Sequence, residues 1–450
     1  MAPVYGLNPF RPQKSFLRFV AGSAVPCKIT AKKICNFERG NMDPITPVDP
    51  NLPETHRANS TQIDAHSALA SAAEISPSAI APSAISPPEP QEPFETRVLL
   101  KILLGPDGLR AGWSVLLFFI LSSILSGIVF LVLIKTHLFD PKDRNFTPYN
   151  TSMGEFPQLL GLLVAGAIVA LIERRRGNLL AFNLLGPHRV RHFIEGLIAG
   201  FVSLSALVGV MAWGGWLRFG PNALSGAQIF KFAALWGVAC LLIGCVEEGQ
   251  FRCYLQFTLT RGINFWWALG ILGLVCLKLL IFNRGTSACW GVFILAGLGL
   301  IPCALLHFKK AESSGFWQAG WVTTTWFGLA HTGNNGENWI GIFAAGAIGF
   351  VFVVSIRVTG SAWWAIGCHA AWDWTETYFY GAIDSGNVAT GHYLTVTPAG
   401  STLWSGGADG PEGSLLVIAV FILMIVALVA IYGRSKPAQF PAPAADSAKG

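Results

Sequence analysis

The chain has 450 residues, of which 52% are hydrophobic and only 12% carry charge. This composition is typical of a membrane protein with several spans and excludes an ordinary soluble domain. The formal net charge of +6 comes mainly from basic residues in loops beside apolar segments. Such charges orient a protein in the bilayer and do not indicate a nucleic-acid partner. The nine cysteines include no CxxC pair, so neither a disulfide framework nor a zinc ribbon is expected.

The first part of the chain differs from the rest. Residues 43–95 are rich in Pro, Ala and Ser, which predicts a disordered cytoplasmic tail over residues 1–95. Residues 1–41 are basic but lack the continuous apolar core of a signal peptide, and Met42 is a candidate for the true start of translation. The membrane domain is expected over residues 96–435, followed by a second disordered tail over 436–450.

Ten apolar segments approach the length of about 20 residues that a helix needs to cross a bilayer. They predict an all-α polytopic transmembrane bundle of about 8–10 spans. The segments are Gly112–Ile134, Pro157–Ile172, Phe193–Trp213, Ile229–Val246, Phe265–Phe282, Ala288–Leu306, Phe316–Ala330, Trp339–Ile356, Ala362–Tyr380 and Ser414–Tyr432.

Positive charge predicts the orientation of these segments. Five arginines follow the second segment, and basic loops lie on the cytoplasmic side of most membrane proteins. Both termini are therefore expected in the cytoplasm, with Arg434 and Lys436 in agreement at the C-terminal end. Short loops and the lack of an organelle signal favour the inner membrane of a bacterium. The five arginines are Arg174, Arg175, Arg176, Arg189 and Arg191.

The first cluster of ionisable residues inside an apolar segment is VEEGQFRCYL, residues 246–255. Two adjacent carboxylates cannot both be charged cheaply in a medium of low dielectric constant. Arg252 lies one helical turn after Glu248 and is expected to keep that carboxylate ionised. Glu247 is then free to act as a general base or a metal ligand. A purely structural Glu248–Arg252 ion pair remains the alternative.

Two histidines mark the other clusters. His331 ends the run TTTWFGLAH, one helical turn after Phe327, whose ring is expected to wall off the site. His369 and Asp373 stand four residues apart in CHAAWDW, which places them on one helix face as joint ligands or as an imidazole and its orienting carboxylate. Separately, each histidine is also compatible with a structural role: His331 at a membrane interface, and His369 satisfied by Asp373.

Taken together, a carboxylate base and two imidazoles from three different spans suit the activation of water for amide hydrolysis. The order EExxxR, FxxxH, HxxxD closely resembles the CAAX-protease and bacteriocin-processing (CPBP) family of intramembrane endopeptidases, which includes the Rce1-type prenyl-protein proteases. The resemblance extends over roughly Arg97 to Arg434, although only the three motifs are specific.

The resemblance implies a site in a cavity that opens toward the cytoplasm, with a membrane-associated peptide or lipidated protein as substrate. It implies that Glu247 activates the water, and that Glu248 and Arg252 support it. His331 and His369 would bind the water, the oxyanion or a metal. Asp373 occupies a position where many members have Asn. A divalent metal such as zinc, held by Glu247, His331 and His369, and a metal-independent glutamate mechanism both remain open.

Two features depart from the expected pattern. Two apolar segments, Phe265–Phe282 and Ala288–Leu306, separate the first motif from the second. An inserted helical hairpin crosses the bilayer twice and so preserves the orientation of every later span. In addition, His331 lies late in its segment whereas His369 lies early in its own. This difference in depth predicts that the His331 helix starts later than drawn, or is tilted or broken.

Two other functions are compatible with buried ionisable groups. A proton- or ion-coupled transporter would use Glu247, His331 and His369 as a relay, but we find no inverted repeat and no pair of interrupted helices. A family member without proteolytic activity would act as a membrane scaffold, but every polar side chain expected of the protease is present. The peptidase is the favoured interpretation.

Overall fold

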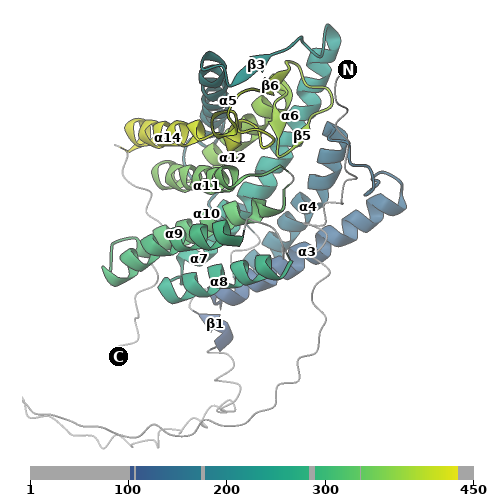
Figure 1. The fold of residues 1–450 in the computed structure, drawn as a ribbon. Coiled ribbons are helices and arrows are strands. Elements are labelled where there is room, and N and C mark those ends of the chain that lie inside the picture. The colour runs from purple at the N-terminus through teal and green to yellow at the C-terminus, as the bar shows by residue number, and fades with distance from the viewer. Residues whose placement is uncertain (1–101, 106–107, 174–177, 283–288, 335, 434–450) are drawn as a thin grey trace, which may run out of the picture. The chain divides into compact units, whose positions relative to one another are not determined.

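A computed structural model describes residues 102–433, apart from 106–107, 174–177, 283–288 and 335. Both predicted tails lie outside the described residues. The predicted all-α fold is confirmed, because helices that pack side by side make up most of the described chain (Figure 1). The α-helices are α3 (Ala111–Lys135), α4 (Pro148–Ile172), α5 (Arg189–Trp213), α6 (Ala227–Glu248), α7 (Gln256–Thr260), α8 (Phe265–Phe282), α9 (Cys289–Phe308), α10 (Ser314–Ala330), α11 (Trp339–Thr359), α12 (Trp363–Asp373), α13 (Thr402–Ser405) and α14 (Leu416–Tyr432).

Shorter elements complete the fold. Within the described residues, two π-helical segments continue α6 and α12, and three antiparallel strand pairs join parts of the loops. The π segments are η2 (Gly249–Leu255) and η4 (Trp374–Tyr380), and the 3₁₀ turns are η1 (Leu179–Ala181), η3 (His331–Gly333) and η5 (Pro411–Gly413). The strand pairs are β1 (Leu104–Gly105) with β2 (Gly108–Leu109), β3 (Leu217–Phe219) with β6 (Val396–Pro398), and β4 (Ile383–Asp384) with β5 (Asn387–Val388).

Each of the ten predicted segments corresponds to a helix, with differences at the ends. The largest concerns α4, which begins at Pro148 and not at Pro157. Thr147 caps this helix by accepting a hydrogen bond from the Asn150 N–H, and Pro148 suits the first helical turn, where its missing N–H is not needed. Among the described residues, six helices are long and apolar enough to cross a membrane. Helices α8 and α14 are apolar but shorter.

Helix α12, which carries the third motif, packs closely against α5 through glycines. A Cβ at Gly196 would lie 2.2 Å from the Trp364 carbonyl oxygen, and one at Gly200 would lie 2.3 Å from that of Cys368. Gly367 approaches α5 in the same way from the other side. Small residues let helix backbones approach one another in membranes, where packing replaces the hydrophobic driving force. This contact holds the backbone on either side of His369.

The predicted hairpin is formed by α8 and α9, which pack against each other and against α10. A Cβ at Gly299 of α9 would lie only 2.0 Å from the Thr325 hydroxyl oxygen of α10. Ala268 and Cys303 of the hairpin share a buried cluster with Phe251 and Phe327, which belong to or adjoin the first two motifs. The hairpin is thus part of the packing that supports the site.

The two ends of the bundle differ. At one end, the Tyr432 hydroxyl of α14 donates to Glu195 of α5 over 2.6 Å. Glu173, which follows α4, and Arg261, which follows α7, form an ion pair of 2.8 Å at the same end. At the opposite end, residues 381–413 form a folded loop in which β6 pairs with β3 beyond α5. The loop is tied to α6 where the Trp236 indole donates to the Thr390 carbonyl oxygen.

Candidate active site

Two pairs of elements position the residues of the first and third motifs. Helix α6 ends with Glu247 and Glu248, and Arg252 lies in the π segment η2 that continues it. Helix α12 carries His369 and ends at Asp373, where η4 begins. Both motifs therefore lie directly before or within a π-helical segment, a geometry that is rare and often found at functional sites.

Glu248 links the first and third motifs. Its Oε1 accepts a hydrogen bond from His369 Nδ1 over 2.9 Å, and its Oε2 lies 3.3 Å from Arg252 Nε. The side chains of Glu248 and Arg252 are both fully buried. The predicted Glu248–Arg252 pair is therefore present, but the carboxylate also orients an imidazole 121 positions further along the chain.

The second nitrogen of His369 faces two other carboxylates. His369 Nε2 lies 3.6 Å from Asp373 Oδ2 and 3.8 Å from Glu247 Oε2. Asp373 thus lies near His369 as predicted, but the carboxylate closest to the His369 ring is that of Glu248. Because a carboxylate oxygen accepts, Nδ1 carries the hydrogen donated to Glu248, and Nε2 is the nitrogen that faces the two other carboxylates. The Glu247 side chain is 33% exposed and that of Asp373 is 18% exposed, so this side of the imidazole is accessible.

The Arg252 guanidinium lies in an aromatic cage. Its Cζ is 4.3 Å from the ring centroid of Phe327, 5.5 Å from that of Phe352 and 5.7 Å from that of Phe251. Neither Nη1 nor Nη2 has a hydrogen-bond partner among the described residues. The cation is therefore stabilised by Glu248 and by the faces of three rings. Phe327, expected only to wall off the site, contacts the supporting cation directly.

His331 lies at the edge of the site. Its Nδ1 is 2.9 Å from the Phe327 carbonyl oxygen, and since a carbonyl only accepts, Nδ1 carries the hydrogen. The Phe327 ring lies 4.8 Å from the His331 ring and 6.2 Å from the His369 ring, between centroids. Among the described residues, His331 makes no hydrogen bond or ion pair with Glu247 or His369. Helix α10 begins earlier than predicted, at Ser314, so a later start does not explain the depth of His331.

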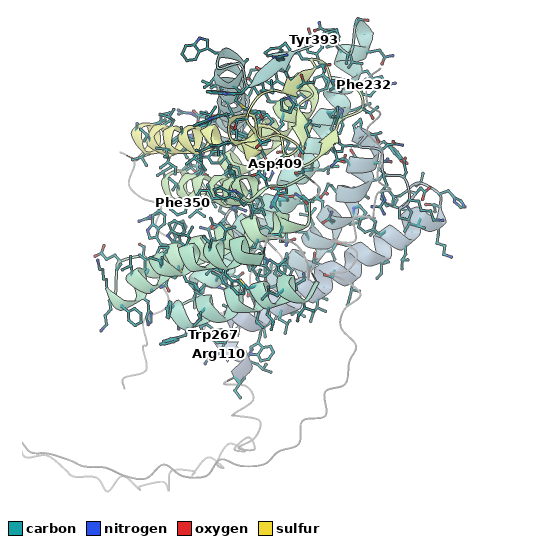
Figure 2. The ribbon with its side chains drawn as sticks, in the orientation of Figure 1. Arg110, Phe232, Trp267, Phe350, Tyr393 and Asp409 are labelled. Atoms are coloured by element: carbon teal, nitrogen blue, oxygen red, sulfur yellow. The ribbon has the colours of Figure 1, made fainter. Side chains whose placement is uncertain are left out.

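The loop over residues 381–413 reaches the His331 side of the site. Glu337, just before α11, accepts hydrogen bonds from Asn334 and from Ser385 of the loop. Glu337 and Asp384 both interact electrostatically with His331, and burial raises the pKa of each of these carboxyls. Figure 2 marks Asp409 of the same loop, which accepts a hydrogen bond from the Asn338 N–H at the start of α11.

One further carboxylate near the site was not predicted. Glu155 of α4 interacts electrostatically with Glu247 and His369, and it accepts a hydrogen bond from Gln158 over 3.1 Å. The predicted span began at Pro157 and so left Glu155 outside the membrane. The Thr147–Pro148 cap, a signal for a helix start, would have placed this carboxylate inside α4.

The metal assignment finds no support in the geometry. Among the described residues, no group of three or more His, Cys, Asp or Glu side chains is arranged to hold a metal ion. Glu247 and His369 are neighbours, but His331 does not join them. The set of Glu247, His331 and His369 as zinc ligands stays a prediction.

A family model described as "Type II CAAX prenyl endopeptidase Rce1-like" matches residues 303–375. Over this segment the chain is similar to that family. The match covers α10, α11 and α12 with the second and third motifs, His331, His369 and Asp373, whereas Glu247, Glu248 and Arg252 precede it. No curated protein and no solved structure matches the chain.

The match and the apolar helices bear on two of the predictions. The protein is an integral membrane protein, and its segment 303–375 is similar to CAAX-type prenyl endopeptidases, in agreement with the resemblance of the second and third motifs. Neither finding supports a metalloprotease in particular. The match does not favour the ion-coupled transporter or the scaffold.

Proposed function

We propose that the protein is an intramembrane endopeptidase that hydrolyses a peptide bond of a membrane-associated or lipidated substrate. The observation that carries this proposal is that the two ring nitrogens of His369 have different surroundings. Its Nδ1 is held by the buried Glu248–Arg252 pair, and its Nε2 faces Glu247, the accessible carboxylate. An exposed base beside an oriented imidazole is what water activation requires.

In this mechanism Glu247 takes a proton from a water molecule as the water oxygen attacks the carbonyl carbon of the scissile bond. The resulting oxyanion is stabilised by imidazole N–H groups. His369 is flanked by the carboxylates of Glu248, Glu247 and Asp373, which favour its protonated form. Protonated His369 donates from Nε2 to the oxyanion. The carbon–nitrogen bond then breaks as the leaving nitrogen receives the proton first taken from the water.

His331 is assigned a supporting role in the same reaction. Its Nδ1–H is used by the Phe327 carbonyl oxygen, so Nε2 is the nitrogen that remains for a substrate. Because His331 adjoins the Phe327 ring and makes no hydrogen bond or ion pair with Glu247 or His369 among the described residues, it suits contact with the substrate chain or the leaving group better than contact with the attacking water. We therefore expect Glu247 and His369 to be more important for the chemical step than His331.

The test uses purified full-length protein in detergent and transmembrane or lipidated test peptides, with the products identified by mass spectrometry. We expect Glu247→Gln to lower kcat by at least about 10²-fold, because a positioned base contributes about 10²–10⁴-fold. Glu195→Gln, which changes a carboxyl group at the other end of the bundle, is the matched control and should retain activity. Cleavage that persists in Glu247→Gln would contradict the assignment of the base.

A further inference from the structure

The buried cation at the centre of the site has a closely fitted neighbour on α11. A Cβ added at Gly349 would lie 2.3 Å from Arg252 Nη2, 3.5 Å from Arg252 Cζ and 3.5 Å from a ring carbon of Phe327. Carbon atoms of real side chains do not approach a nitrogen as closely as 2.3 Å, so one of the two groups would have to move. Gly349 belongs to none of the three predicted motifs.

The guanidinium cannot give way without disturbing the site. Its side chain is completely buried, and three aromatic rings surround it. The same guanidinium holds Glu248 through the 3.3 Å contact of its Nε, and Glu248 in turn holds His369. A displacement at Nη2 is therefore transmitted through Glu248 to the imidazole that faces Glu247.

We infer that Gly349 is a positioning residue of this active site: its missing side chain provides the space that keeps Arg252, and through it Glu248 and His369, in working geometry. The inference rests on the proposed peptidase function and adds to it a residue outside the motifs. The three atoms nearest to a Cβ added at Gly349 belong to Arg252 and Phe327, and none belongs to Glu247 or His369. Substitution of Gly349 should therefore act on the chemical step and leave substrate binding largely unchanged.

The same helix offers a matched control. Gly346 also lies within α11, but a Cβ there would meet only ordinary contacts, the nearest being the Thr324 carbonyl oxygen at 3.6 Å. Both substitutions by alanine remove a glycine from a helix interior, where alanine is the better helix former. Any difference between Gly349→Ala and Gly346→Ala thus reports the contact with Arg252 and not helix propensity.

The experiment combines these variants with Arg252→Lys, which removes the atom that an alanine at 349 would strike. We expect Gly349→Ala to lower kcat by about tenfold or more, equivalent to the loss of about 1.4 kcal/mol of transition-state stabilisation. KM should change less than about twofold, and Gly346→Ala should behave like the wild type. In the Arg252→Lys background, Gly349→Ala should cause less than about a twofold further change, because double-mutant cycles show non-additivity between residues in contact.

Two results would overturn the inference. One is a Gly349→Ala variant that matches Gly346→Ala in kcat. The other is a Gly349→Ala substitution that lowers kcat by the same factor in the wild-type background and in the Arg252→Lys background. The same four variants can also be compared by their thermal unfolding midpoints, a measurement that needs no substrate. If Gly349→Ala lowers the midpoint in the wild-type background but not in the Arg252→Lys background, the contact between position 349 and the Arg252 guanidinium is supported. If the wild type cleaves no peptide, the proposed function fails, while this second comparison still decides whether Gly349 leaves the space that Arg252 occupies.

Discussion

Two neighbouring carboxylates in this chain have opposite environments. The Glu248 side chain is fully buried between Arg252 and His369, whereas that of Glu247 is one-third exposed. A buried ion pair that loses one partner leaves an uncompensated charge, which costs about 3–5 kcal/mol. We therefore expect Glu248→Gln to lower the free energy of unfolding by about that amount. Glu247→Gln should abolish activity with little loss of stability.

Both substitutions keep the shape of the side chain, so each serves as the control for the other. The measurement is unfolding of the purified protein by a denaturing detergent, followed by tryptophan fluorescence, beside the peptide assay. If the two variants were equally stable, the charge on Glu248 would not be needed by Arg252, and the cation–π contacts with Phe327 and the other rings would have to suffice.

At the scale of residues, the sequence predicts local pairs and misses distant ones. The Glu248–Arg252 and His369–Asp373 pairs follow from a spacing of four positions on a helix. The contact from Glu248 to His369 depends on how α6 packs against α12, and nothing in the spacing of motifs specifies it. The same holds for Gly349, because a glycine in an apolar helix gives no sign of the guanidinium beside it.

At the scale of elements, helix existence was predictable and helix type was not. Every predicted span was located by its apolar length, but the sequence pattern does not distinguish the π segments η2 (GQFRCYL) and η4 (WTETYFY) from continued α-helix. In a π segment the hydrogen bonds span five residues and not four, so the residues that follow point to other sides of the helix than they would in a continuous α-helix. This is one reason why placing Glu247, Arg252 and His369 around a shared centre required the structure.

The loop 381–413 should respond to pH because its carboxyl groups are buried. Burial, together with nearby carboxylates, raises the pKa of Asp409 to about 8 and that of Glu412 to about 8. The folded loop therefore holds these protons more tightly than the unfolded chain does. Its stability is greatest below about pH 4, where both states are protonated, and is lost as the pH rises toward 8.

We expect the thermal unfolding midpoint to fall between pH 5.5 and pH 8.5, and to fall less in the double variant Asp409→Asn, Glu412→Gln. Both amides keep an oxygen that accepts the hydrogen bonds now donated by the Asn338 N–H and the Trp372 indole. An equal fall in the wild type and the double variant would show that other groups control the response to pH.

At the scale of the whole molecule, hydrophobicity and motif order were sufficient to predict the fold class and the family resemblance. The family match covers only about one sixth of the chain and begins within α9. The first motif lies before it, separated by α8 and most of α9. From the sequence we interpret this hairpin as an insertion. In the structure it packs against α10, the helix that contains Phe327.

The distribution of charge between the two ends of the bundle predicts the topology. The end where α5 begins and α14 ends carries basic residues, and the loop 381–413 at the opposite end carries acidic ones. By the positive-inside rule the basic end is cytoplasmic and the loop lies outside. Basic residues described at the first end include Arg189, Arg191, Arg261, Lys309, Lys310 and Arg357, and the acidic residues of the loop are Asp384, Asp409 and Glu412.

Cysteine labelling in intact cells tests this orientation independently of enzymatic activity. Thr390, in the loop, and Glu312, between α9 and α10, are both exposed. We expect Thr390→Cys to react with a membrane-impermeant maleimide in intact cells, and Glu312→Cys to react only after the membrane is permeabilised, each measured above the labelling of the parent protein. The reverse pattern would place the loop in the cytoplasm. The acidic loop 381–413, which reaches the His331 side of the site, would then lie on the cytoplasmic face. This is the face from which the family resemblance implies that the substrate enters.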